Sequence, residues 1–358
     1  MEGNLKLKKI LTTLCAVAML AGCTAGGSKK SSTNTSTNTS TKEETAATVM
    51  VGTGSVTSVS NKAKEGSDTA AQFDTTFASV VLEDNVIKYV YFDVAQDKVT
   101  YDATGHVTSD NTTSTSKKAL GDKYGMKDKS SIKKEWYEQV EALEKWAVGK
   151  TVEEVLNMPT TQKDEKHTVT ADKDLMTGCT IGVTAFQQAL EKAAKNAVEV
   201  KDVASVGSAI LTQVSGKDAS AEKSGEAKAS STYGVVALDK DGKVVFTQTD
   251  EAQNAVKFTT AGALDGEAAA VATKGEKKDE YGMKKASSIG KEWFEQNQAY
   301  DEWTVGKTAK EIADMKVTTN EGGKTVTADK DLMTGCTMGV DSLQKVTATA
   351  IAAATKLN

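Results

Sequence analysis

A polar segment of thirteen residues occurs twice in this chain. Thr168 to Thr180 reads TVTADKDLMTGCT, and Thr325 to Thr337 repeats it letter for letter. The segment combines carboxylates, hydroxyls, glycine and cysteine, and its Asp-Lys-Asp and Thr-Gly-Cys-Thr parts are poor material for a hydrophobic core. The sequence around it differs between the two copies, so something local keeps this segment constant. We therefore predict that the segment forms a functional site in each copy rather than a buried strand.

Histidine chemistry is excluded as a function shared by the two copies. The chain has two histidines, His106 and His167, and neither has a counterpart in the second copy, where Lys324 replaces His167. A Ser-His-Asp triad or a shared histidine metal site is therefore not expected. All 44 basic residues are lysines, so anions must be held by lysine, backbone N–H or hydroxyl groups. The net charge of −5 and the lack of a basic stripe argue against nucleic acid as a partner.

The repeated segment belongs to a larger internal duplication. An offset of 157 residues relates Tyr124–Lys127 to Tyr281–Lys284 and continues without a gap for 60 positions, of which 36 are identical. This period is too long for a solenoid repeat and is the size of a domain. We predict a first domain at residues 49–201 and a second at residues 202–358.

Each copy is expected to place strands before helices. Runs rich in β-branched and aromatic residues predict strands, and Asp241-Gly242 is typical of a hairpin turn between two of them. The predicted strands cover residues 77–84, 86–94 and 98–102 in the first copy, and 232–238 and 243–249 in the second. Strands followed by helices favour an α+β fold, with a small antiparallel sheet plus helices in each copy.

The helices are predicted from apolar spacing and from capping residues. Trp136, Val140, Leu143 and Trp146 fall on one face of a helix. Thr151 and Thr308 each fit a capping box that opens a short helix. Amphipathic helices are expected at about 184–198 and 341–354. The repeated polar segment then lies just ahead of the last helix of each copy.

The segment resembles the flavinylation motif of the FMN-binding domain family. The motif reads Asp-x-x-Ser/Thr-Gly-Ala-Ser/Thr, and Asp174–Thr180 and Asp331–Thr337 match it except that cysteine replaces the commonest alanine. The resemblance implies two tandem FMN-binding domains, with FMN linked through its phosphate to the last threonine of each motif by an ApbE-type flavin transferase. The implied acceptors are Thr180 and Thr337. The other implied cofactor-site residues are Thr177, Gly178, Cys179, Asp174, Met176 and Met126 in the first copy, and Thr334, Gly335, Cys336, Asp331, Met333 and Met283 in the second.

The roles of several of these residues stay open at this point. Asp174 and Asp331 either bind the metal used during flavin transfer or cap their loop. The four methionines either line the flavin or simply pack. Aromatic residues upstream either stack on the flavin or belong to the core, and their helical spacing favours the core; they are Trp136, Trp293, Tyr124 and Tyr281. A Cys179–Cys336 disulfide is not expected, because each cysteine belongs to its own copy.

The N-terminus has the pattern of an export signal. Lys6, Lys8 and Lys9 precede an apolar run too short to span a bilayer. The run ends in Leu20-Ala21-Gly22-Cys23, which resembles a bacterial lipobox. We predict a lipoprotein signal peptide at residues 1–22, lipidation of Cys23, and a flexible polar tether at residues 23–48. The mature chain is then expected on the outer face of the bacterial plasma membrane.

This layout is similar to two-domain lipoproteins of flavin-based extracellular electron transfer in Gram-positive bacteria, the pheromone-encoding lipoprotein type. The resemblance implies an electron carrier rather than an enzyme with its own substrate. Electrons would pass from a membrane quinol-oxidising donor to extracellular acceptors such as iron(III). A peptide pheromone released from the signal peptide is implied by the resemblance alone. The alternative is a non-redox surface lipoprotein with adhesive or solute-binding modules, and only the repeated motif separates the two hypotheses.

Overall fold

The structure is a computed structural model that describes residues 48–61, 66 and 68–357. The predicted signal peptide, Cys23 and the tether up to residue 47 lie outside these residues. Within the described part of the chain, no helix is long and apolar enough to cross a membrane.

The first repeat is built on a sheet of three long antiparallel strands in the order β3-β2-β1, with a short strand added beside β1. A two-residue turn at Asp84 and Asn85 joins β2 to β3. Both turn residues have positive φ, 51° and 64°, which matches the twist of a tight hairpin. The strands are β1 (Val49–Asn61), β2 (Thr69–Glu83), β3 (Val86–Tyr101) and β7 (Val198–Val200).

The second repeat forms an equivalent sheet in the order β10-β9-β8-β13. The predicted turn joins β9 to β10, with the Gly242 N–H bonded to the Asp239 carbonyl and a Gly242 φ of 76°. A short strand of the first repeat, β4 (Thr113–Ser114), also pairs with β8. The strands of this sheet are β8 (Ser205–Lys217), β9 (Gly225–Leu238), β10 (Val244–Phe258) and β13 (Thr355–Lys356).

The two sheets pack against each other. Strand β3 contacts β8 and strand β1 contacts β10. The rings of Tyr101 and Phe258 stack between the sheets at a centroid distance of 3.8 Å, and those of Phe77 and Tyr233 lie 5.4 Å apart. Three clusters of buried apolar side chains contain residues of both repeats. The repeats therefore share a core, and their described residues form one compact unit.

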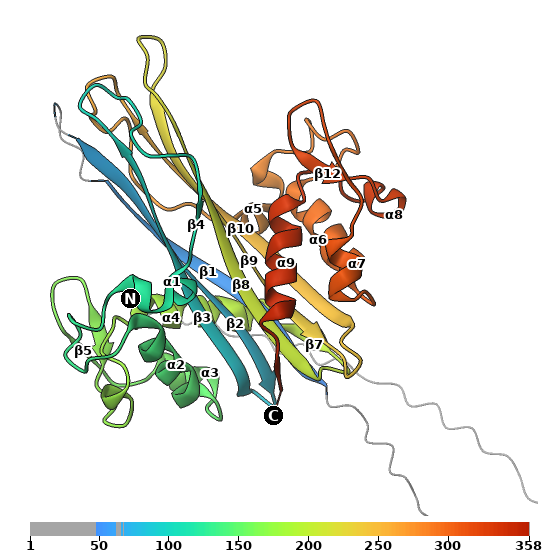
Figure 1. The fold of residues 1–358 in the computed structure, drawn as a ribbon. Coiled ribbons are helices and arrows are strands. Elements are labelled where there is room, and N and C mark those ends of the chain that lie inside the picture. The colour runs from blue at the N-terminus through green and yellow to red at the C-terminus, as the bar shows by residue number, and fades with distance from the viewer. Residues whose placement is uncertain (1–47, 62–65, 67, 358) are drawn as a thin grey trace, which may run out of the picture. The chain divides into compact units, whose positions relative to one another are not determined.

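The helices cover the outer face of each sheet, so the fold has four layers in the order helix, sheet, sheet, helix. In Figure 1 the green helices of the first repeat and the orange and red helices of the second lie on opposite sides of the strands. In the first repeat α4 packs on β1 and β2 and α2 on β3, and in the second α9 packs on β8 and β9 and α6 on β10. The helices of the first repeat are α1 (Lys117–Leu120), α2 (Trp136–Ala147), α3 (Val152–Leu156) and α4 (Thr184–Lys195). Those of the second are α5 (Lys274–Lys277), α6 (Trp293–Thr304), α7 (Ala309–Ala313), α8 (Lys330–Met333) and α9 (Asp341–Ala352).

Shorter elements complete each repeat. Three 3-10 turns are η1 (Gly121–Tyr124), η2 (Leu175–Thr177) and η3 (Lys278–Tyr281). Two small hairpins pair β5 (Thr160–Gln162) with β6 (Thr168–Thr170), and β11 (Val317–Thr319) with β12 (Thr325–Thr327).

The α+β prediction is confirmed, and the capping boxes at Thr151 and Thr308 are present. The strand predictions were wrong in extent. Residues 86–94 and 98–101 belong to one strand, β3, which ends one residue before the predicted end at residue 102, and the first strands of both sheets, β1 and β8, were missed. Those two strands contain many small serine and glycine residues, and they lack the continuous run of large apolar residues that predicts a buried strand. Their small side chains lie between the helices on one face and the other sheet on the opposite face. The predicted helices were slightly long, because α4 ends at Lys195 and α9 at Ala352.

The domain boundaries at residues 201 and 202 stay a prediction. The three long strands and β7 of the first sheet lie within residues 49–200, and β8, β9, β10 and β13 within residues 205–356. The shared core nevertheless makes the two repeats one packed body rather than two separate ones.

Candidate functional site

Each repeated segment runs from a short strand through a helical turn to the start of a long helix. In the first repeat it passes from β6 through η2 and reaches Thr180, four residues before α4. The Asp172 carboxylate starts the turn, because its Oδ1 accepts hydrogen bonds from the N–H groups of Asp174 and Leu175 at 3.1 and 2.9 Å. Leu175 and Cys179 are buried and anchor the loop in the core. Thr180 itself is half-buried, so its side chain stays at the surface of the fold.

A buried glutamine holds the predicted acceptor threonine in both repeats. In the first, the Oε1 atom of Gln139 accepts the Thr180 N–H at 2.9 Å and the Thr180 hydroxyl at 3.1 Å. In the second, Gln296 Oε1 accepts the Thr337 N–H at 2.9 Å and lies 3.4 Å from the Thr337 hydroxyl. Both glutamines are fully buried on the inner face of α2 or α6.

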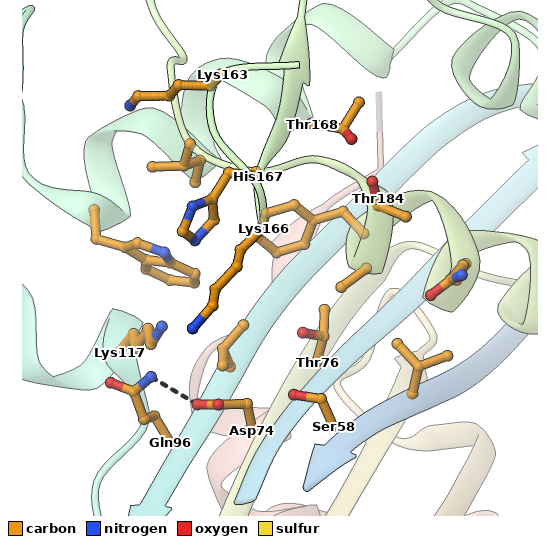
Figure 2. Close-up of a pocket in the computed structure, with 18 of the residues that line it drawn as sticks. Ser58, Asp74, Thr76, Gln96, Lys117, Lys163, Lys166, His167, Thr168 and Thr184 are labelled. Carbon is orange, nitrogen blue, oxygen red and sulfur yellow. Dashed lines mark hydrogen bonds between the residues drawn. The ribbon is translucent and has the colours of Figure 1, made fainter. Parts of the chain in front are cut away.

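A cavity of about 640 Å³ lies beside Thr180. Its size is in the range of sites that bind drug-sized ligands. Figure 2 shows Lys166 and His167 reaching into it from the loop after β5, opposite Asp74 on β2. Other lining residues that matter below are Lys117, Tyr124, Met126, Trp136 and Lys163.

One wall of the cavity is aromatic and carries a lysine. The ammonium group of Lys117 lies 5.1 Å from the ring centroid of Tyr124 and 5.5 Å from that of Trp136. The corresponding group in the second repeat is Lys274, which lies 5.4 Å from Tyr281 and 5.5 Å from Trp293. Such contacts are favourable electrostatically, because the ring faces carry partial negative charge. The same wall is therefore built twice.

A buried aspartate positions each of these lysines. Asp93 accepts a hydrogen bond from the Ser116 hydroxyl at 2.7 Å and from the Lys118 N–H at 3.0 Å, at the start of α1. Asp250 accepts equivalent bonds from the Thr273 hydroxyl at 2.5 Å and the Gly275 N–H at 2.9 Å. Burial raises the pKa of the Asp250 carboxyl to about 6, and these hydrogen bonds partly oppose the rise.

The loop that carries the methionine of each wall is held by a glutamate. Glu135, at the N-terminus of α2, accepts the Met126 and Lys127 N–H groups at 2.9 and 3.0 Å. Glu292 does the same for Met283 and Lys284, at 2.8 and 2.9 Å. Desolvation acts to raise the pKa of Glu135, but the backbone N–H donors outweigh it and lower that pKa.

A second, smaller cavity of about 250 Å³ also borders Thr180. Its lining includes Lys129, Ser130, Lys163 and Gln139. The Lys163 ammonium donates a hydrogen bond to the Thr180 carbonyl at 3.1 Å. Lysine and hydroxyl groups therefore lie beside Thr180 on this side. In a chain without arginine, these are side chains that can bind an anion.

The second repeat has a corresponding cavity of about 690 Å³ that differs in three respects. Met338 and Gly339 line it, whereas Thr337 does not, and the nearest polar neighbour of the Thr337 hydroxyl besides Gln296 is Ser288 Oγ at 3.4 Å. Lys274 is ion-paired with Glu251 at 2.8 Å. Residues Asn111, Thr112 and Thr113 of the first repeat complete its wall.

The structure brings only some of the predicted site residues to the cavities. Met126 and Met283 line them. Met176 and Met333 do not, and both are 45% exposed on the surface. The Thr177 and Thr334 hydroxyls donate to the carbonyls of Asp174 and Asp331 in their own helical turns. The two aspartate side chains are exposed, and the described residues contain no group of three or more His, Cys, Asp or Glu suited to hold a metal ion.

The glycines and cysteines of the two segments contribute to packing and do not line the cavities. A Cβ at Gly178 would lie 2.7 Å from the Ala142 Cβ on α2, and Gly335 meets Ala299 on α6 in the same way at 2.6 Å. Only glycine lets the segment approach the helix this closely. Cys179 and Cys336 are free, buried thiols, one in the core of each repeat.

Sequence reasoning missed Gln139, Gln296, Lys117, Lys274, Glu135 and Glu292. A signal for the glutamines was present, because Glu-Trp-x-Glu-Gln occurs in both copies at the same offset and puts a polar residue near the apolar face of a helix. The lysines precede the 60-position alignment by seven residues and had no pattern to mark them.

Comparison with known proteins found no matching family model, no matching curated protein and no matching solved structure.

Proposed function

We propose that the chain is an electron carrier that holds two FMN groups, each joined through its phosphate to a threonine, Thr180 or Thr337. The observation that carries the proposal is the doubled acceptor site. In both repeats a half-buried threonine ends an identical polar segment and is held by a buried glutamine. In both, a cavity of 640 or 690 Å³ with the same lysine, tyrosine, tryptophan and methionine lies next to the segment.

The chemistry of the lining fits a flavin nucleotide. Aromatic and methionine side chains offer an apolar face for a planar ring system. Lys163 and Lys129 beside Thr180 supply positive charge for a phosphodiester. The first turn of α4, which has no side-chain cap, adds free N–H groups that favour an anion.

When bound, FMN supplies the redox chemistry, since it takes up one or two electrons. The residues of the chain hold it and exclude water. Lys117 on the aromatic wall offsets negative charge in the first cavity, where no carboxylate of the described residues pairs with it. In the second cavity Lys274 is already paired with Glu251. The chain contributes no substrate chemistry of its own in this proposal.

The setting proposed for the carrier is the outer face of a bacterial plasma membrane. Lipid on Cys23 would anchor the chain, a quinol-oxidising membrane system would donate electrons, and acceptors such as iron(III) would receive them. Covalent attachment has a physical reason there, because a weakly bound cofactor is lost by mass action where free flavin is dilute.

Intact mass spectrometry tests the proposal. The full chain, co-expressed with a flavin transferase, is expected to gain two FMN groups less two water molecules and to be yellow. Thr180→Ala and Thr337→Ala are each expected to lose one of these additions, and the double variant both. An unmodified, colourless chain from cells in which a known acceptor protein is flavinylated would refute the proposal.

A further inference from the structure

We infer that Gln139 and Gln296 are positioning residues for flavin transfer, and that each holds its threonine hydroxyl so that the oxygen lone pairs face outward. The inference rests on the proposed function, since it concerns the same acceptor sites. It goes beyond that function in assigning a role to a buried side chain of α2 and of α6.

The orientation of the Gln139 amide is fixed by backbone groups. Its Nε2 donates to the Lys134 carbonyl at 3.1 Å, which only accepts, and to the Ser130 hydroxyl at 3.1 Å. Its Oε1 accepts the Thr180 N–H at 2.9 Å, which only donates. In a flipped amide, Oε1 would face the Lys134 carbonyl oxygen and Nε2 would face the Thr180 N–H, and neither pair can form a hydrogen bond. Only the observed orientation satisfies both backbone groups.

Gln296 repeats this arrangement in the second copy. Its Nε2 donates to the Lys291 carbonyl and to the Ser287 hydroxyl, both at 3.0 Å. Its Oε1 accepts the N–H groups of Thr337 and Met338 at 2.9 and 3.1 Å. Two copies that differ at 24 of 60 aligned positions therefore keep the same buried amide on an equivalent carbonyl, serine and threonine, with a longer contact of 3.4 Å to the Thr337 hydroxyl.

The fixed amide determines where the hydroxyl proton points. Gln139 Oε1 has no proton, so the Thr180 hydroxyl must be the donor in their 3.1 Å contact. The remaining lone pairs of Oγ1 then point away from Gln139, which lies on the core side of the threonine. A nucleophilic oxygen held in one orientation reacts faster than one that must first be ordered.

The group transfer itself balances with one co-reactant, an activated FMN phosphoanhydride such as flavin adenine dinucleotide. Thr180 Oγ1 forms a bond to the FMN phosphorus, the anhydride P–O bond breaks, AMP leaves with that electron pair, and the hydroxyl proton is released. An amide is too weak a base to take this proton. Gln139 therefore positions the nucleophile, and the proton, which becomes acidic as the bond to phosphorus forms, then leaves the amide for water or for a base of the transferase.

The test compares modification rates at the two sites of one molecule. The purified full-length Gln139→Met chain is treated with flavin transferase and flavin adenine dinucleotide. The fraction of each peptide that carries FMN, one containing Thr180 and one containing Thr337, is then measured over time. The rate at Thr180 is expected to fall by at least about tenfold, while Thr337 in the same chain is unaffected. Because Gln139 is fully buried and cannot touch the transferase, kcat should fall with KM unchanged.

Further variants separate positioning from packing. Gln139→Glu keeps an oxygen acceptor for Thr180 and is expected to retain more of the rate than Gln139→Met. Gln139→Asn, which keeps the amide but withdraws it by one methylene, replaces the Met variant if that variant does not fold. The mirrored Gln296→Met should slow Thr337 alone.

A folded Gln139→Met chain modified at Thr180 as fast as the unaltered chain would overturn the inference. Equal slowing in the Met and Glu variants would also overturn it, because that result reports packing rather than the acceptor oxygen. An unaltered chain that is modified at neither threonine would instead refute the proposed function.

Discussion

Cys179 and Cys336 each directly precede a proposed acceptor threonine, yet their side chains are buried in the core. Both are fully buried among the apolar side chains of their own repeat. Burial raises the pKa of each thiol to about 11. One residue of the motif thus anchors the loop in the core, and the next stays at the cavity.

We expect neither thiol to react in the folded chain. At pH 7 a thiol with this pKa is almost entirely protonated, and the thiolate is the reactive form. Alkylation with iodoacetamide, mapped by peptide mass spectrometry, should leave Cys179 and Cys336 unmodified until denaturant is added. A Thr177→Cys variant, which introduces a thiol at an exposed position, provides the positive control. Alkylation of the two native cysteines as fast as the introduced thiol would contradict the assignment.

The repeated motif indicated where a site lies but not which of its residues face the ligand. Met126 and Met283 line the cavities, whereas Met176 and Met333 lie on the surface, and spacing alone does not distinguish these cases. That distinction depends on the 3-10 turn at Leu175–Thr177, whose direction is set by Asp172 and by the burial of Leu175.

The N-terminal ends of α2 and α6 connect the helices to the cavity walls. Glu135 accepts hydrogen bonds from its own helix in a capping box and from the loop that carries Met126. Gly125, with φ of 73°, turns the chain between Tyr124 and Met126 so that both line the cavity. One carboxylate therefore fixes a helix end and a ligand-facing loop together.

We expect Glu135→Ala to lower the melting temperature by several degrees and to slow flavinylation at Thr180. The substitution removes the acceptor of N–H groups in both the helix end and the loop. Because its pKa is lowered in the folded state, its contribution is present above the ordinary glutamate pKa and is lost as the pH falls through the folded value. Thermal unfolding between about pH 3 and pH 7 measures this.

Glu141→Ala serves as the matched control, since Glu141 is exposed in the middle of the same helix. It should change the melting temperature little. Equal effects of the two substitutions would argue against the role given to Glu135.

At the scale of the whole molecule, the contact between the two sheets contains a buried carboxyl group that has no ion-pair partner among the described residues. Asp97 on β3 is 1% exposed, and its neighbours on the same face, Ala95 and Val99, belong to the clusters between the sheets. Neither carboxylate oxygen forms a hydrogen bond of good geometry among the described residues, and the nearby Ser114 and Thr212 hydroxyls offset its burial only in part. Its counterpart in the second repeat is the neutral Asn254, which accepts the Val271 N–H at 2.9 Å.

We expect Asp97→Asn to stabilise the fold at neutral pH. Burial raises the pKa of Asp97 to about 6, so ionisation opposes folding. The free energy of unfolding of the unaltered chain is unaffected by Asp97 below the unfolded pKa near 4, where the carboxyl is protonated in both states. It decreases by roughly 2–3 kcal/mol as the pH rises through 6. Denaturant unfolding should show this gain at pH 7.5 and little gain at pH 4. Asn254→Asp should act in the opposite direction, and pH-independent curves for both variants would contradict the explanation.

Neither this contact nor the shared core was predictable from the sequence. The duplication predicts two tandem units, but an offset of 157 residues carries no information about which faces of the repeats meet. The helices and caps were predictable, since spacing and capping residues act locally. The first strands, by contrast, are buried because helices cover one of their faces and a second sheet covers the other.

The wall that Asn111, Thr112 and Thr113 contribute to the second cavity has a consequence for the history of the chain. A gene segment that encoded only the second copy would produce a cavity open on one side, and would also expose the sheet face that now meets the first copy. The two halves are thus expected to be inherited, deleted and transplanted together.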